Sequence, residues 1–309
     1  MHIETLKVFC DLAEIGSFSL TASKNFITQS AVSQQVRSLE ERYGWELVER
    51  SRGRVRLTQA GEVVYQAGKE IVQKYREIED NFQTLLRSVA GTVRVATVES
   101  VGLYELASPL KRYLRTFPDV NVHLEYTQAN KIYEDVSRGD IDLGIVAYPN
   151  KRPQLLVTPF REDRLVLVCA PQHPFAQFHR LPIKKLDGEK FVGFERDIPT
   201  RRALDRILRR HGVKVRYVME VDNIEIIKRV VEIGSGISIV PEPCIAQEIK
   251  NETLKAIQFT DEVVMRPLGI ISKRGRHFSP AVQEFVEFLT EKTSRGTAGR
   301  PDRALQATA

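Results

Sequence analysis

The sequence predicts a mixed α/β protein with a small all-α head, a long linker helix and a larger α/β body of two lobes. Short apolar stripes at helical spacing occupy the head, and apolar residues then recur every three or four positions as far as residue 89. From Gly91 onward, segments with strand character alternate with segments of helical periodicity, a pattern typical of α/β domains. We therefore expect four parts in chain order: a head at 1–58, a linker helix at 59–90, a body at 91–293 and a disordered tail at 294–309.

The composition is that of an ordinary globular protein, with 42% hydrophobic and 28% charged residues. A formal net charge of +6 favours a polyanionic partner. Residues 1–60 nevertheless carry eight Lys or Arg against seven Asp or Glu, so a basic surface in the head must be local. The first residues lack a secretory signal and no stretch is long and apolar enough to span a bilayer, so we expect a cytoplasmic protein without membrane contact.

The segment 28–43 predicts the central helix of the head. Val32, Val36, Leu39 and Tyr43 follow each other at steps of four and three, which places them on one apolar stripe. The opposite face is short, polar and rich in hydrogen-bond donors: Gln29, Ser30, Ser33, Gln34 and Arg37. Such side chains suit base edges in the DNA major groove, where Arg reads guanine and Gln reads adenine. The alternative is an ordinary amphipathic surface helix.

Two short helices are predicted before this one. The first has its own apolar stripe: Leu6, Phe9, Cys10 and Ala13. Gly16 and Ser17 interrupt that stripe, and Ser19 can cap a second helix that holds Ala22 and Phe26. Two helices that lead into a third form the helix-turn-helix plan, in which the last helix enters the groove.

A hairpin is predicted after this helix, with strands at 46–50 and 55–57 and a turn near Gly53, which would form a wing. Arginines recur at every second position across it: Arg50, Arg52, Arg54 and Arg56. On one side of the wing they could meet phosphates. The alternative is a solvated edge strand.

The linker predicts one long helix over 58–89, about 48 Å at 1.5 Å per residue. Thr58 is placed to cap it, and its apolar seam has no break: Ala60, Val64, Ala67, Ile71, Tyr75, Ile78, Phe82, Leu85 and Val89. A seam of this length favours the same helix of a second copy, which would make a dimer and set two recognition helices on one face. The alternative is a helix docked on its own body.

The body predicts two α/β lobes, lobe I at about 91–160 and 267–293 and lobe II at about 161–266. Lobe I is expected to have strands at 92–98, 121–126 and 141–147 and helices at 103–117 and 130–138. Lobe II is expected to have strands at 164–170, 190–194, 215–221 and 237–240 and helices at 200–211, 223–233 and 242–249. The chain returns through 263–272 to a helix at 280–289. Chain crossings near 147–160 and 264–270 would connect the lobes.

A ligand cleft is expected between the lobes, because ligands of α/β sheets bind beside the carboxyl ends of strands and helix N-termini. Residues at such positions form a polar, donor-rich set: Glu99, Ser100, Gly102, Thr127, Gln128, Asn130, Ile198, Pro199, Thr200, Arg201 and Asn223. Arg201 or Arg196 would favour a small anion, whereas Glu99 would repel one and leave room for an amino group or a carboxylic acid. The alternative for each residue is a helix cap without a ligand.

Five stretches of the head carry a dense, ordered pattern: Leu6-Lys7-Val8-Phe9, Gly16-Ser17-Phe18-Ser19, TQSAVSQQVRSLE at 28–40, Leu47-Val48-Glu49-Arg50 and Leu57-Thr58-Gln59-Ala60-Gly61. This pattern resembles the signature of the LysR-type transcriptional regulators. The body has landmarks similar to the effector domain of that family: Tyr104, Phe117-Pro118, GDIDLGI at 139–145 and GSGISIVP at 234–241. The resemblance covers residues 1 to about 292.

The resemblance implies a winged helix-turn-helix head and a body with the fold of a type 2 periplasmic binding protein. It implies DNA contacts from two sets of residues: Gln29, Ser30, Ser33, Gln34 and Arg37 on the recognition helix, and Arg50, Arg52 and Arg54 on the wing. The expected partners are double-stranded operator DNA, a small-molecule effector, a second or further copies in a dimer or tetramer, and RNA polymerase.

The rival reading is a small-molecule binding protein without regulatory DNA binding. Enzyme activity is not expected, because no metal-binding HExxH or CxxC spacing, GxSxG order or Walker-type loop occurs. No cofactor or metal is expected either. Cys10, Cys169 and Cys244 lack disulfide or metal spacing, so we expect them buried and reduced, with redox sensing as the alternative.

Overall fold

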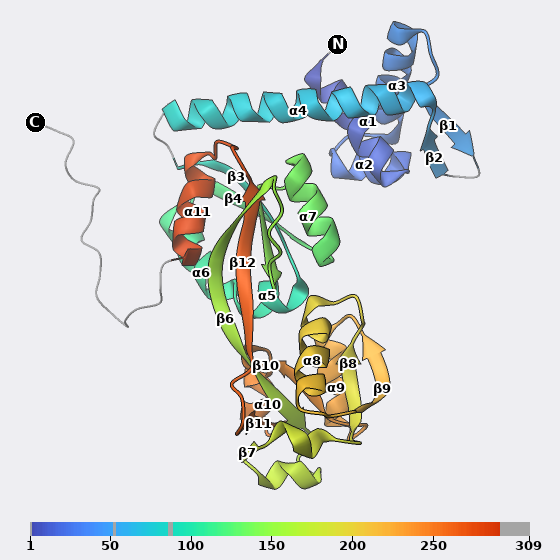
Figure 1. Ribbon diagram of the computed structural model, residues 1–309. Helices are drawn as coiled ribbons and strands as arrows, with labels where there is room; N and C mark the ends of the chain where they lie inside the picture. Colours follow the sequence, from blue (N-terminus) through green and yellow to red (C-terminus); the bar gives the residue numbers. More distant parts are fainter. Residues whose placement is uncertain (1, 52–53, 86–88, 291–309) are drawn as a thin grey trace, which may run out of the picture. The chain divides into compact units, whose positions relative to one another are not determined.

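The computed structural model describes residues 2–51, 54–85 and 89–290. The chain forms two compact units, residues 1–88 and 89–309 (Figure 1). The predicted disordered tail lies outside the described residues, and so do residues 86–88 at the end of the predicted linker. Within the described part of the chain, no helix has the length and apolar character that crossing a membrane requires.

The first unit begins with three helices, α1 (Ile3–Ile15), α2 (Phe18–Lys24) and α3 (Gln29–Tyr43). Their apolar stripes enclose one core: Val8, Phe9, Leu12, Ala22, Val32, Val36, Leu39, Leu47 and Val48. The Thr28 side chain caps α3 by accepting a hydrogen bond from the Ala31 amide at 3.2 Å. The helix ends at Gly44, which takes the left-handed conformation with φ 71° that glycine tolerates.

Three details of this unit differ from the sequence prediction. Ser17 holds the N-cap position of α2, so Ser19 lies inside the helix. Phe26 is not part of α2: it follows the helix with φ 54° and is 96% exposed. Tyr43, expected on the buried stripe, is 42% exposed because it lies in the last turn of α3, beyond the small core.

The hairpin consists of β1 (Val48–Ser51) and β2 (Arg54–Leu57), paired antiparallel. The linker helix α4 (Gln59–Leu85) has 27 residues, and Thr58 caps it by accepting a hydrogen bond from the Gly61 amide. Part of the helix packs on α1, where Gly68 lies close to Cys10 and Leu6. Four of its large apolar side chains are exposed in this chain: Val63, Ile71, Tyr75 and Ile78.

The first lobe of the second unit is built on β3 (Gly91–Thr97), β4 (Val120–Tyr126) and β5 (Leu143–Ala147), which pair in parallel. The helices α6 (Ala107–Thr116) and α11 (Pro280–Thr290) cover one face of this sheet, and α7 (Ala129–Arg138) covers the other. The predicted helix at 103–117 is two helices, since α5 (Glu99–Tyr104) ends before α6 begins.

The second lobe contains the parallel pair β8 (Lys190–Phe194) and β9 (Arg216–Val221). The strands β10 (Ser238–Pro241) and β11 (Lys255–Phe259) pair with β6 instead, and the short β7 (Arg180–Leu181) pairs with β11. Its α-helices are α8 (Pro199–Arg210), α9 (Ile224–Glu232) and α10 (Ala246–Lys250). The sequence did not predict β11, and the predicted helix at 242–249 is a 3-10 turn followed by α10.

The two lobes share two long strands, β6 (Leu155–Cys169) and β12 (Met265–Lys273) (Figure 1). They pair antiparallel from Leu155 to Arg164 of β6, with one irregularity between Leu268 and Gly269. Beyond this region β6 continues into the second lobe, where it pairs with β10 and β11. The expected crossings therefore lie mostly within strands and not in loops.

Candidate functional site

The helix α3 divides into a buried face and a polar face. Val32, Val36 and Leu39 are almost completely buried. The predicted DNA-contacting side chains lie on the other side: Gln29, Ser30, Gln34 and Arg37 are exposed, and Ser33 is half-buried. The structure therefore brings all five predicted side chains to one side of the helix.

Short polar contacts hold parts of this face. Ser19 of α2 donates a hydrogen bond to the Gln29 amide oxygen at 3.0 Å, so the first turn of α3 is tied to α2. Arg37 donates to Glu41 at 2.9 Å, one helical turn further along. Both members of this ion pair are more than half exposed, so the pair contributes little to stability and leaves the guanidinium available for a partner.

The hairpin register differs from the expected single row of arginines. Arg50 is paired with Val55, whereas Arg56 is paired with Glu49. Paired residues share a face of an antiparallel ladder, and faces alternate along each strand. Arg50 and Arg56 thus hold register positions of opposite faces, because the turn shifts the alternation that the sequence spacing suggested. Arg52 lies outside the described residues.

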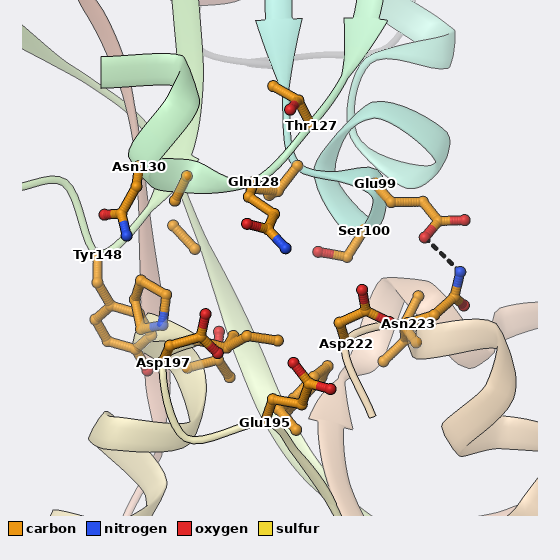
Figure 2. A pocket seen from close by; sticks show the side chains of 18 of the residues that line it. Glu99, Ser100, Thr127, Gln128, Asn130, Tyr148, Glu195, Asp197, Asp222 and Asn223 are labelled. Atoms are coloured by element: carbon orange, nitrogen blue, oxygen red, sulfur yellow. Dashed lines mark hydrogen bonds between the residues drawn. The ribbon is translucent and has the colours of Figure 1, made fainter. Parts of the chain in front are cut away.

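A cavity of about 620 Å³ lies between the two lobes of the second unit. Most of the predicted effector residues line it: Glu99, Ser100, Thr127, Gln128, Asn130, Ile198, Pro199, Thr200 and Asn223. Figure 2 shows Ser100 and Gln128 reaching into this space from the first lobe, opposite Glu195 and Asp222 of the second. The structure therefore gathers residues that are distant in sequence around one space.

Gly102 and Arg201 do not line this cavity. Gly102 is a packing residue, because a Cβ atom there would come within 2.2 Å of the Tyr126 ring. Arg201 is buried inside the second lobe, where it bonds Asp205 at 3.0 Å and Glu220 at 2.7 Å. The expectation that Arg201 adds positive charge to the cleft is therefore wrong.

Arg196, the alternative source of charge, does not line the cavity either. Its side chain is 83% exposed and lies 3.7 Å from the Glu220 carboxylate. Most of the charged and aromatic residues that line the cavity were not predicted from the sequence: Tyr126, Tyr133, Tyr148, Glu195, Asp197, Arg202, Asp222 and Arg266. Glu195 and Asp197 directly follow β8, and Asp222 directly follows β9, so the strand-end rule could have found them.

Carboxylates outnumber guanidinium groups around the cavity. Four acidic residues line it: Glu99, Glu195, Asp197 and Asp222. Among the residues that the structure describes, none of these four carboxylates forms an ion pair with a basic side chain. Arg202 and Arg266 are the arginines of the lining, and Arg266 is already paired with Asp163. A bound anion would therefore face net negative charge.

Three helices begin at the cavity without a side-chain cap. The N-cap residues of α5, α7 and α8 are Val98, Gln128 and Ile198; all three line the cavity, and none accepts a capping hydrogen bond through its side chain. The first amides of such helices lack helical partners and attract acceptors. By contrast, Asn223 caps α9 by accepting hydrogen bonds from the Glu225 and Ile226 amides.

Arg266 is a buried arginine of the cavity lining. Its side chain is 2% exposed and donates through Nε to Asp163 at 2.9 Å and through Nη1 to Ser100 Oγ at 3.0 Å. Arg266 and Asp163 are direct partners across β12 and β6. Glu105, also buried, pairs with Arg161 at 3.1 Å, and burial and the nearby Asp163 raise the pKa of Glu105.

Direct contacts between α5 and α9 connect the lobes at one side of the cavity. Asn223 donates a hydrogen bond to Glu99 at 2.7 Å (Figure 2). Tyr104 donates to Glu225 and accepts from the Lys228 ammonium at 2.8 Å. Burial and the hydrogen bond to Glu225 raise the pKa of Tyr104 to about 12. The structure thus holds the lobes together through uncharged and charged hydrogen bonds.

Two family models match the chain. Residues 3–62 match the bacterial regulatory helix-turn-helix protein of the lysR family, and residues 87–294 match the LysR substrate binding domain. The second match covers well over half of the chain. The chain belongs to the LysR family. It is a DNA-binding transcriptional regulator with an effector-binding domain, as the sequence analysis predicted.

Relatives of this LysR-family chain include the RuBisCO operon transcriptional regulator of Allochromatium vinosum, 28% identical, with 96% of this chain and 98% of the relative covered. The regulatory domain of CcmR from Synechocystis, in complex with 2-PG, is 26% identical with a TM-score of 0.61 and covers 66% of this chain and 99% of that one. Full-length CbnR, complexed with its target DNA, is 20% identical with a TM-score of 0.68 and covers 94% and 99%. The CbnR likeness shows the shared fold.

The three cysteines of this LysR-family chain are buried, as predicted. Burial raises the pKa of the Cys169 thiol to about 11 and that of Cys244 to about 12. The thiolate, which is the form that reacts with oxidants, is therefore scarce at neutral pH. This chemistry argues against the alternative in which either of these two cysteines senses redox state.

Proposed function

We propose that this LysR-family chain binds operator DNA through the polar face of α3 and adjusts that binding when a small molecule occupies the cleft between its lobes. It acts by binding alone, in the cytoplasm, where it can reach the chromosome. The proposal rests on one surface in each unit: the exposed polar face of α3, whose opposite face is buried, and a cavity lined by both lobes. A ligand can shift the regulator only by binding one arrangement of the lobes better than another.

We also propose that the chain pairs through α4. Four large apolar side chains of that helix are exposed in the single chain: Val63, Ile71, Tyr75 and Ile78. Ile71, Tyr75 and Ile78 recur at steps of four and three, so they form one stripe that a second helix could bury. A dimer built in this way would present two copies of α3 to two half-sites of the DNA.

The chemistry of the cleft favours an effector that carries both a positive and a negative group. The observation behind this proposal is that one cavity is shared by three helix N-termini without side-chain caps and by four carboxylates that form no ion pair with any described residue. An ammonium group satisfies the carboxylates, and a carboxylate or phosphate can accept from backbone amides in the first turns of these helices. A simple anion would meet repulsion of about 1 to 4 kcal/mol from each carboxylate that it approached within 4 Å.

A ligand series that differs only in charge tests this proposal. Thermal shift measurements on the full chain would compare 4-aminobutyrate, butyrate and butylamine, followed by longer amino acids and their deaminated acids. We expect compounds with both charges to raise the melting temperature, and Glu195→Gln with Asp222→Asn to remove that response. Glu252→Gln, which changes an exposed carboxylate outside the cavity lining, is the matched control. Stabilisation by the anions alone, kept or strengthened in the double variant, would contradict the proposed effector class.

A further inference from the structure

Phe26 holds an unfavourable place in the head. It follows α2 and takes the left-handed conformation with φ 54°. The Ile27 amide donates to the Ala22 carbonyl at 3.1 Å and the Phe26 amide to the Ser23 carbonyl at 3.3 Å, the hydrogen bonds of a Schellman helix end. In that motif Gly normally takes the left-handed position, because a Cβ atom there crowds the backbone, and Asn tolerates it because its short polar side chain can hydrogen-bond locally.

Within the described part of the chain, no burial of the Phe26 ring offsets that strain. Its ring is 96% exposed, the most exposed of the large apolar side chains in the described part of the chain. Ile27, the next residue, packs against the core of the head instead. Phenylalanine at this position therefore costs the folded chain both backbone strain and exposed apolar surface. Residues held in such strain cluster at binding sites, which points to a partner for the ring.

The position of Phe26 identifies the kind of partner. Thr28, Gln29 and Ser30 are exposed and form the first turn of α3, so the exposed surface continues from the loop into the predicted DNA-reading face. Three residues of chain span at most about 11 Å, which is less than the roughly 12 Å width of the DNA major groove. When Gln29 reaches base edges, the Phe26 ring lies within reach of the same groove.

We propose that the Phe26 ring packs on a thymine methyl group in the major groove, next to the bases that α3 reads. The thymine methyl is the apolar feature of the major groove, and phenylalanine is among the side chains that contact it. The inference rests on the proposed DNA-reading role of α3. The contact would recognise thymine through its methyl group. Hydrogen bonds cannot do this, because uracil presents the same hydrogen-bonding groups and lacks only that methyl.

The test uses the full chain and a duplex that carries its footprinted binding site. Each thymine of the site is replaced in turn by deoxyuridine, which removes the methyl group alone. We expect one replacement to weaken binding of the unaltered chain about fourfold, the effect of burying one methyl group. Phe26→Asn should bind the thymine and deoxyuridine duplexes equally and should melt at a higher temperature, because Asn tolerates the left-handed conformation.

The matched control is Glu252→Gly, which relieves the same left-handed strain at φ 57° in the second unit. It should raise the melting temperature and keep the response to deoxyuridine. If Phe26→Asn keeps that response, the ring does not touch the methyl group and the proposal is wrong. The proposal is also wrong if Phe26→Asn leaves DNA binding unchanged and alters only the mass of the assembly measured by sedimentation. That result would mean that a second copy of the chain covers the ring. A chain that binds no duplex at all would instead overturn the proposed function.

Discussion

Removing the buried guanidinium of Arg266 should strongly destabilise the second unit. In an Arg266→Met variant, Asp163, itself 4% exposed, loses its hydrogen-bonded partner. Glu105, a second buried carboxylate close to Asp163, would keep its ion pair with Arg161. Removing one member of a buried pair costs about 3 to 5 kcal/mol, because an uncompensated charge remains inside the protein. This loss is a large part of the stability of a typical domain.

Urea unfolding followed by circular dichroism measures this loss. With a denaturant slope of about 2 kcal/mol per M, a loss of about 4 kcal/mol lowers the midpoint by about 2 M. The double variant Arg266→Met with Asp163→Leu removes both charges and replaces them by apolar groups of similar size. We expect it to recover most of the lost stability, because such replacements are often neutral.

Two results would refute this reasoning. An Arg266→Met variant that unfolds at the wild-type midpoint would mean that water or rearrangement solvates Asp163 in the folded chain. A double variant no more stable than Arg266→Met would mean that the loss comes from packing of the arginine stem and not from the unpaired carboxylate. Ser100→Ala serves as a control, since it removes only the hydrogen bond that Arg266 donates to Ser100.

Two further predictions concern the lobe contact and the DNA-reading face. The pKa of Tyr104 is raised to about 12 in the folded chain from its ordinary value of about 10, so the folded state holds the proton more tightly and stability should fall as pH rises from about 10 to 12. Tyr104→Phe should flatten that part of an alkaline unfolding curve, and an unchanged slope would contradict the assignment. Arg37→Ala should leave the unfolding midpoint almost unchanged, because its pair with Glu41 is exposed, but should relax discrimination between preferred and mutated sites by about 1 to 3 kcal/mol in competition binding. Equal loss on all duplexes would instead indicate a phosphate contact.

The parts of the fold that follow from local periodicity were predictable. The buried positions Val32, Val36 and Leu39 of α3 and the cap at Thr58 depend on residues three or four positions apart, and the structure confirms them. The strand-end rule similarly placed most of the predicted cleft residues around the cavity. Phe26 was placed wrongly because its apolar character matches the stripe of α2, whereas a helix end, set by backbone hydrogen bonds, decided its conformation.

The charge of the cleft could not be read from single residues. Arg201 looked like a cleft residue at the start of α8, but it lies inside the lobe, because Glu220 on a distant strand completes its set of partners. Asp205, one turn along the same helix, was a local sign of this pairing. Arg266 lines the site but was not predicted to do so. Its partner Asp163 is 103 positions away, so nothing nearby in the sequence indicated its place.

The strands β6 and β12 limit what an effector can do to this regulator. Both run from one lobe to the other, and the ladder between them extends over nine residues of β12. A large rotation of one lobe against the other would break backbone hydrogen bonds between β6 and β12. We therefore expect a ligand to change the twist of this two-stranded ribbon instead. The irregularity between Leu268 and Gly269 is the place where this ribbon can bend or twist most easily. We therefore expect the change in lobe orientation on effector binding to be gradual and small.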